Sequence, residues 1–211
     1  MKEPIAMVLL FALAPIVTSQ ESPRTIMAVV AHADDVLTFA PLLARYSRQG
    51  TNVYLVAVAN EQTAISGRNT TPEGPHGPEL TRIISDETRC ACRELGIKDP
   101  ILLEFEDSNL GQVSRPPWAQ VAAVKREISR IFQQVRPDVV ITTGPEGMYG
   151  HPDHLLVGAI VTELVQSGAE NAPSLLLYHG FSKDRQSAWH GQEPFSFVES
   201  RFLTVRPILG S

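Results

Sequence analysis

The chain has 211 residues, of which 43% are hydrophobic and 19% charged, and its formal net charge is −5 at pH 7. This length suits one well-buried α/β domain and is too short for two of ordinary size. A modestly negative chain has no excess of lysine and arginine with which to hold a phosphate backbone. We therefore expect no nucleic-acid partner.

The N-terminus has the pattern of an export signal. Lys2 precedes an apolar run over residues 5–17, and residues 17–19 are the small V-T-S, the order that a signal peptidase recognises. The run is too short to span a bilayer comfortably. We expect a signal peptide over 1–19, a single domain over 20–211, no membrane span in the mature chain, and secretion or periplasmic residence. The alternative is a buried N-terminal helix.

Strands and helices are expected to alternate along the rest of the chain. Buried parallel strands are short, nearly continuous apolar runs, whereas helices show apolar residues at every third or fourth position. The predicted strands span 26–31, 53–59, 101–105, 139–142, 175–178 and, at an edge, 201–205, and the predicted helices span 41–49, 79–95, 118–135 and 155–165. This alternation predicts a Rossmann-like three-layer α/β sandwich with a mostly parallel sheet of about five or six strands.

Cys90 and Cys92 fall on the predicted helix 79–95. Two residues apart on a helix, their side chains point to roughly opposite sides and cannot bridge each other. Both are expected to be buried thiols.

Chemically active residues follow two of the predicted strands. His32, Asp34 and Asp35 come directly after the first strand, and the run H-P-D-H over residues 151–154 follows the fourth after a short loop. In open α/β sheets the crevice beyond the carboxyl ends of the strands is where ligands bind. The sequence therefore predicts that the two clusters meet around one metal ion.

The residue types favour hydrolysis over nucleotide binding. Neither a G-x-G-x-x-G segment nor a phosphate-binding loop follows the first strand. Three nitrogen and oxygen ligands with one position left for water are typical of a catalytic zinc site. We expect His32, Asp35 and His154 to be the ligands, Zn²⁺ to be the metal, and Fe²⁺ to be the alternative.

Four further residues are candidates for catalysis. Asp34 adjoins a ligand and is placed to take a proton from metal-bound water. His151 is expected to face the same substrate from the other side, with Asp153 to orient it and Tyr149 to add a hydrogen bond. The alternative for the aspartates is that they only cap the N-termini of turns or helices.

Both motifs resemble those of one family. A-H-A-D-D at 31–35 and G-H-P-D-H at 150–154 resemble the paired signatures A-H-P-D-D-E and G-H-P-D-H of the PIG-L (LmbE-like) zinc-dependent de-N-acetylases. The likeness continues through E-x-x-x-A-x-x-x-L-G at 87–96 and the strand with its aspartate at 101–107. It implies that His32, Asp35 and His154 are metal ligands, that Asp34 is the general base, and that His151 polarises the carbonyl and helps to protonate the amine.

The chain departs from the family pattern at three positions. Ala33 replaces the family's proline, Val36 replaces its glutamate, and Ile84 stands where an arginine is often found. Loss of the glutamate removes a carboxylate near the metal or the substrate, which bears on activity and substrate choice. The expected ligands and base are all present.

The resemblance implies a zinc-dependent N-deacetylase, a hydrolase acting on a linear amide C–N bond. The expected substrate is a small molecule, an amino sugar or an N-acetylglucosaminyl conjugate, which loses its acetyl group by attack of a zinc-bound water. One alternative is a non-catalytic carbohydrate-binding relative of the same fold. Another is an amidase acting on a non-sugar N-acyl amine.

Overall fold

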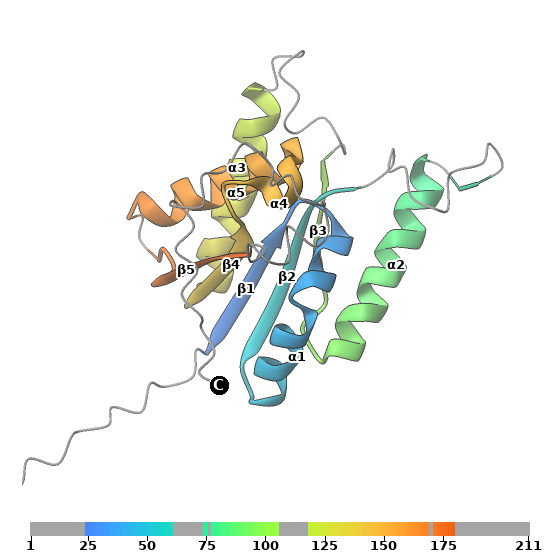
Figure 1. The fold of residues 1–211 in the computed structure, drawn as a ribbon, viewed down its shortest axis with the longest axis horizontal. Coiled ribbons are helices and arrows are strands. Elements are labelled where there is room, and N and C mark those ends of the chain that lie inside the picture. The colour runs from blue at the N-terminus through green and yellow to red at the C-terminus, as the bar shows by residue number, and fades with distance from the viewer. Residues whose placement is uncertain (1–23, 61–73, 76, 106–117, 169–170, 180–211) are drawn as a thin grey trace, which may run out of the picture.

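The structure is a computed structural model, and it describes residues 24–60, 74–75, 77–105, 118–168 and 171–179 (Figure 1). The expected signal peptide at 1–19 and the expected edge strand at 201–205 lie outside these residues.

Five strands form one wholly parallel sheet in the order β3-β2-β1-β4-β5. The three inner strands are almost completely buried, which is why the sequence shows them as continuous apolar runs rather than alternating ones. The expected parallel α/β sheet is confirmed. The strands are β1 (Thr25–Val30), β2 (Asn52–Ala59), β3 (Ile101–Phe105), β4 (Val139–Thr143) and β5 (Leu175–His179).

The four predicted helices are present, and the described residues contain two short ones in addition. The long helices are α1 (Ala40–Arg48), α2 (Gly77–Leu95), α3 (Trp118–Val135) and α5 (Pro152–Gln166); the short ones are the 3-10 helix η1 (Ala33–Thr38) and α4 (Gly147–Gly150). No described helix combines the length and the apolar character that crossing a bilayer requires. On α2, Cys92 is buried as expected, but the expectation for Cys90 was wrong, because its side chain faces solvent.

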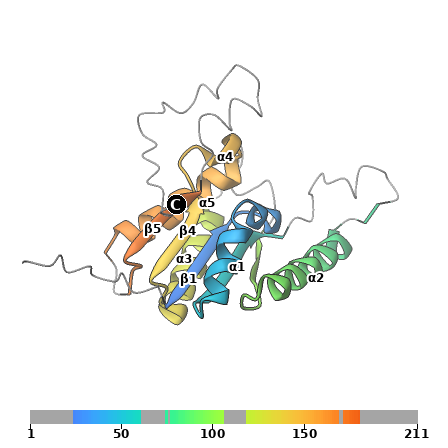
Figure 2. The same ribbon diagram turned by 60° about the horizontal axis from the view of Figure 1, so that its bottom comes forward.

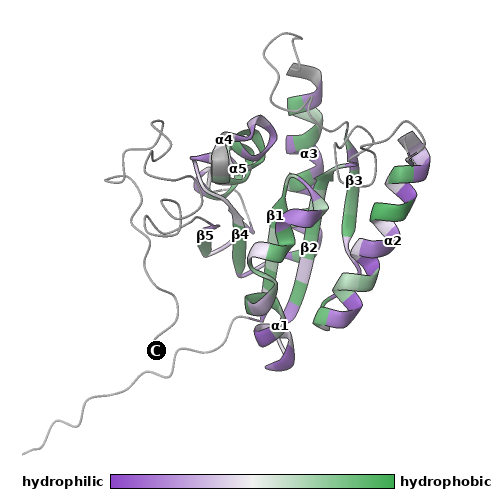
Figure 3. Cartoon of the chain, turned by 45° about the vertical axis from the view of Figure 1, so that its right-hand side comes forward, coloured by the Kyte–Doolittle hydropathy of each residue, from purple (hydrophilic) through white to green (hydrophobic). Residues whose placement is uncertain are grey.

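The helices cover both faces of the sheet and so complete three layers (Figures 1 and 2). One face packs Met27, Val29, Val56, Val58 and Val140 against apolar residues of α3 and α5. The other packs Ile26, Ala28, Val30, Val53 and Leu55 against Leu43 of α1 and Cys92 of α2. Apolar residues accordingly dominate the central strands, while polar residues line the outer side of α2 (Figure 3).

The strand order places a topological switch point between β1 and β4. From β1 the chain moves outward to β2 and β3, then returns to the other side of β1 as β4 and continues to β5. Val29 lies opposite Thr142, whose hydroxyl donates to the Val29 carbonyl at 2.9 Å. β1 and β4, which are followed by the two motifs, are thus hydrogen-bonded to each other just before the crevice in which such folds bind ligands.

Candidate metal and catalytic site

The first motif folds into a tight turn at the end of β1. The His32 N–H donates to Asp35 Oδ2 at 3.0 Å, and the Asp35 N–H donates back to the His32 carbonyl at 3.4 Å. This reciprocal pair begins η1 and turns the Asp35 side chain inward, where it is 7% exposed, while Asp34 remains exposed. Of the two adjacent aspartates, one is therefore buried and the other exposed, although a carboxylate oxygen of each lies within 4.8 Å of the other.

The second motif begins α5. Pro152 occupies the first helical position, where its missing N–H costs nothing, and His151 Nδ1 accepts the Asp153 N–H at 3.2 Å as the helix cap. The helix therefore starts three residues before the predicted 155–165 segment. His154 lies in the first turn, fully buried, with Nδ1 3.1 Å from the Gly147 carbonyl.

Gly147 is the position in this loop that most clearly requires glycine. Its φ is +63°, and a Cβ there would lie 2.8 Å from Leu155 Cγ. A side chain would therefore be strained by the backbone and blocked by α5. Because the Gly147 carbonyl accepts from His154, the tight turn of α4 helps to set the direction of that imidazole.

The three expected ligands converge. His154 Nε2 lies 3.1 Å from His32 Nδ1 and 3.1 Å from Asp35 Oδ1, and His32 Nδ1 lies 3.9 Å from Asp35 Oδ2. A tetrahedral Zn²⁺ with bonds of 2.0–2.1 Å holds its ligand atoms about 3.3 Å apart. The donor set therefore fits a metal ion in chemistry, and the two separations from His154 Nε2 are close to the spacing of such ligands.

The outer nitrogens of these imidazoles are also engaged. His32 Nε2 lies 3.4 Å from Oδ2 of Asp153, a carboxylate that is completely buried, and His154 Nδ1 faces the Gly147 carbonyl. Metal-binding histidines commonly have such a partner, which fixes the tautomer and orients the ring. Asp153, which was expected to orient His151, thus meets His32 through its side chain and His151 through its backbone.

His151 completes a cluster of three imidazoles. Its ring centroid lies 4.9 Å from that of His32 and 4.8 Å from that of His154. His32, His151 and His154 form one alternative trio of potential ligands, and His32, Asp34 and Asp35 form another. The side chain of Tyr149 lies outside the described residues, so its expected hydrogen bond stays a prediction.

The two aspartates have opposite electrostatic environments. The Asp34 side chain reaches solvent, but the surrounding protein removes part of its hydration, and this desolvation together with the negative charge of Asp35 raises the pKa of Asp34. Burial alone would also raise the pKa of Asp35, but the hydrogen bond and charge of His154, with further help from His32, hold it below its usual value. One carboxylate is thereby kept charged, as a ligand requires, and the other is a stronger proton acceptor than an ordinary aspartate.

Two residues near the site were not singled out in the sequence. His179 ends β5, with its ring centroid 5.6 Å from that of Phe39, and burial lowers its pKa although the charge of Asp35 opposes this. Glu146 is 8% exposed, neither carboxylate oxygen has a hydrogen-bond partner among the described residues, and burial raises its pKa. Both lie at or just beyond the carboxyl end of a strand, the same signal that identified the two motifs.

Val36, which replaces the family's glutamate, is part of the core. It is 4% exposed and belongs to the apolar cluster that includes Leu43 and Phe39. Ala33 is buried in the same cluster. The change at position 36 is therefore matched by an apolar environment and does not face open solvent.

The sheet is wholly parallel, and histidine and aspartate donors lie together at its switch point. The fold and the site are therefore those of an α/β protein with a candidate metal site. Residues 27–165 match the family described as PIG-L, GlcNAc-PI de-N-acetylase. The chain belongs to this family.

The relatives show how far the likeness extends. A 1D-myo-inositol 2-acetamido-2-deoxy-alpha-D-glucopyranoside deacetylase 2 from Catenulispora acidiphila is 32% identical over an alignment of 164 positions, and the alignment covers 70% of this chain and 53% of the relative. The chain spans about half the length of the curated relatives it matches.

Solved structures support the fold. An N,N'-diacetylchitobiose deacetylase from Pyrococcus horikoshii aligns with a TM-score of 0.59 and 22% identity, covering 75% of this chain and 61% of that one. A 4-carboxy-2-hydroxymuconate hydratase from Pseudomonas putida aligns with a TM-score of 0.53 and 17% identity, covering 74% and 62%. Since one fold carries both names, the activity must be argued from the site.

Proposed function

We propose that this chain is a metal-dependent hydrolase that removes an N-acetyl group from an amino sugar or an N-acetylglucosaminyl conjugate. The observation that carries the proposal is the convergence of His32, Asp35 and His154 donor atoms beside Asp34. Membership of the PIG-L family and the names of the relatives support the substrate class.

The donor set suits a divalent metal with mixed nitrogen and oxygen ligands. His32, Asp35 and His154 would hold it, with zinc the first choice and ferrous iron the alternative. When bound, such an ion supplies a Lewis acid that stabilises negative charge on a carbonyl oxygen.

The remaining chemistry belongs to side chains that flank this set. Hydrolysis of an acetamide requires a group that accepts a proton from the attacking water and one that donates to the leaving amine. Asp34 is exposed, adjoins a ligand and has a raised pKa, which suits the acceptor. His151 suits the donor, because its Nδ1 accepts the Asp153 N–H and the neutral ring must then carry its proton on Nε2.

Activity of three variants tests these roles. We expect Asp34→Asn and His151→Ala each to lower kcat for deacetylation of N-acetylglucosamine by about a hundredfold or more, the scale of a lost general base or oxyanion donor. Asp86→Asn makes the same change at an exposed position of α2 and should leave kcat unchanged. Near wild-type turnover in Asp34→Asn or His151→Ala, with metal retained, would show that the roles are wrongly assigned.

Metal content tests the ligands independently of activity. We expect stoichiometric metal in the wild type and in His151→Ala, and its loss in Asp35→Ala and His154→Ala. Loss of metal from His151→Ala and His154→Ala, with metal retained in Asp35→Ala, would favour the trio of imidazoles as the ligand set.

A panel of N-acetylated compounds separates the proposal from its two alternatives. Turnover of acylated non-sugar amines without turnover of sugars would indicate a different amidase. Sugar binding without turnover of any compound, in protein loaded with metal, would indicate a carbohydrate-binding relative.

We also propose that residues 1–19 are an export signal, from Lys2, the apolar run and the V-T-S that follow. N-terminal sequencing of protein from its native host tests this. A mature chain that begins at Met1 would contradict it.

A further inference from the structure

Met148 has a backbone conformation that residues other than glycine rarely adopt. Its φ is +63°, and its side chain is 7% exposed. Among the described residues, Arg136 and Asn171 are the other two non-glycine residues with positive φ, and both are exposed and precede a strand, at the amino edge of the sheet. A positive φ is unfavourable for a residue with a Cβ, although asparagine tolerates it. Met148 combines this strain with burial at the carboxyl edge, where the candidate metal site lies.

The strained residue belongs to the short turn α4. Gly147, Met148 and Gly150 have φ values of +63°, +63° and +85°. The Gly147 N–H donates to the Gly144 carbonyl at 2.9 Å, and the Gly150 N–H donates to the Glu146 carbonyl at 3.1 Å. Strained backbone of this kind persists only where the surrounding structure holds it, and it is typical of functional sites.

The peptide between Gly147 and Met148 is the part of this turn that meets the metal site. Its carbonyl accepts from His154 Nδ1 at 3.1 Å and from the His151 N–H at 3.4 Å. Because a carbonyl only accepts, a neutral His154 carries its proton on Nδ1, and the lone pair of Nε2 is left for a metal. The direction of this carbonyl is set by ψ of Gly147 and φ of Met148.

Half a turn of this one peptide plane reverses the arrangement. A rotation by about 180° brings φ of Met148 to about −120°, which is ordinary for a residue with a Cβ, and Gly147 tolerates the accompanying change in ψ. The carbonyl then points away from His154, and the Met148 N–H points toward it. Nδ1 must now accept, so the proton moves to Nε2, which can no longer bind a metal.

We propose that Met148 is a positioning residue of the metal site: its positive φ keeps the Gly147 carbonyl on Nδ1 of His154 and so keeps Nε2 free for the metal. The inference rests on the proposed metal-dependent function and adds to it a residue that acts through His154. A ligand shifts two competing conformations only by binding one of them better. Metal affinity should therefore follow how well the residue at position 148 tolerates a positive φ.

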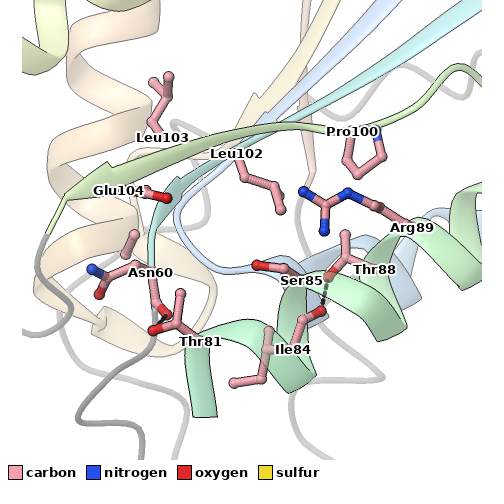
Figure 4. A pocket seen from close by; sticks show the side chains of 12 residues that line it. Asn60, Thr81, Ile84, Ser85, Thr88, Arg89, Pro100, Leu102, Leu103 and Glu104 are labelled. Carbon is pink, nitrogen blue, oxygen red and sulfur yellow. Dashed lines mark hydrogen bonds between the residues drawn. The ribbon is translucent and has the colours of Figure 1, made fainter. Parts of the chain in front are cut away.

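A cavity at the same edge of the sheet is separate from this turn. It has a volume of about 270 Å³ and lies between α2 and β3, and Ala33, Ala59 and Asn60 complete its lining (Figure 4). Neither Gly147 nor Met148 lines it. An effect of Met148 variants on metal binding does not arise from this cavity.

Two variants separate the backbone from side-chain packing. Asparagine is unsuited to a buried apolar position but tolerates a positive φ, whereas valine suits a buried position and, being β-branched, tolerates a positive φ least. Metal-free full-length protein, titrated with Zn²⁺ against a competing chelator, should bind about tenfold more tightly as Met148→Asn than as Met148→Val, the equivalent of about 1.4 kcal/mol. Equal affinity, or tighter binding by Met148→Val, would overturn the inference, because packing alone would then set the affinity.

A second pair of variants gives the same comparison if either of these proteins does not fold. Met148→Gly and Met148→Ala leave nearly the same space but differ in their tolerance of a positive φ. The glycine variant should bind Zn²⁺ about fivefold more tightly than the alanine variant. Equal affinity of this pair would also overturn the inference.

Arg136→Gly is the matched control. It removes the same kind of strain from an exposed residue at the opposite edge of the sheet, after α3, where glycine is favoured. We expect it to raise Tm by about 2–4 °C and to leave the affinity for Zn²⁺ unchanged. A change in affinity as large as that between the Met148 variants would mean that overall stability, and not the orientation of one peptide, controls metal binding.

Failure of the proposed function gives a different result, because the affinities are measured without turnover. If they follow the expected order but zinc-loaded protein deacetylates none of the N-acetylated compounds, the deacetylase proposal is wrong and the role of Met148 stands. If deacetylation occurs but the Met148 variants bind Zn²⁺ equally, Met148 is not a positioning residue. A wild type that binds no Zn²⁺ would contradict both.

Discussion

Gly158 on α5 offers a sharp test of how the site is positioned. It lies one helical turn after His154, on a helix whose first turn carries His154 and Asp153. A Cβ at this position would lie 2.5 Å from the Thr143 carbonyl oxygen, about 0.5 Å closer than the 3.0 Å below which Cβ contacts essentially never occur. The obstacle is backbone, so Gly158→Ala must push α5 away from β4.

The expected size of the effect combines two opposing contributions. Overpacking of this kind costs about 1–3 kcal/mol, whereas replacing glycine by alanine inside a helix gains about 1 kcal/mol. We expect a net loss of about 1 kcal/mol in the free energy of unfolding. Displacement of His154 should also weaken metal binding by about tenfold, the lower end of the effect of disturbing residues that orient a ligand.

Ala159→Gly is the matched control. Ala159 is the next residue of the same helix and is exposed, so this variant should lose about 1 kcal/mol of helix propensity without changing metal affinity. Chemical denaturation and zinc titration of both variants give the two quantities. A Gly158→Ala protein that is more stable than wild type and binds zinc unchanged would refute the reasoning, because helix propensity alone would then explain it.

Three further predictions concern other parts of the fold. Burial raises the pKa of Cys92 to about 11, so at about pH 8 a thiol reagent should modify Cys90 in the folded chain and Cys92 only after denaturation; rapid reaction of both thiols would contradict the packing. Because burial raises the pKa of Glu146, the folded state retains a proton that the unfolded state releases, and stability should fall as pH rises above the usual glutamate pKa of about 4.3. Glu146→Gln should therefore raise Tm at about pH 8 and have little effect at about pH 4, and an equal effect at both would show that its carboxylate is satisfied in the fold. Asp138 Oδ2 accepts the backbone N–H groups of Arg24 and Thr25, each at 2.9 Å, so Asp138→Ala should lower the free energy of unfolding by about 1–3 kcal/mol in urea denaturation; an unchanged midpoint would mean that water replaces the carboxylate without cost.

The strands were the most predictable part of the molecule. A strand buried on both faces must be apolar throughout, so β1, β2 and β4 were recognisable from composition alone. The bounds of β3 and α3 also agree with the predicted ranges.

Short turns of helix were not predictable in the same way. η1 depends on the reciprocal hydrogen bonds of His32 and Asp35, and α4 contains two glycines and no apolar stripe. The start of α5 was placed too late because Asp153 and His154 are polar, yet both are completely buried within the first turn. Polar residues that belong to a functional site interrupt the hydrophobic periodicity from which the bounds of the helix were predicted.

The residues gathered at the site were predictable, but their pairing was not. Motif positions at the ends of β1 and β4 indicated that the clusters would meet. Which carboxylate faces which imidazole depends on the turns that follow each strand, and no sequence spacing predicted the approach of Asp153 to His32.

The adjacency of β1 and β4 has a consequence for how the chain folds. His32 and His154 are 122 residues apart in sequence, so the donor set does not exist until most of the domain has been synthesised and β4 has docked beside β1. A contact of such long range is expected late in folding, because its loop must close first. A metal ion that needs all three donors binds only the folded state and stabilises it by mass action. The ion should therefore slow unfolding and raise the midpoint of the unfolding transition.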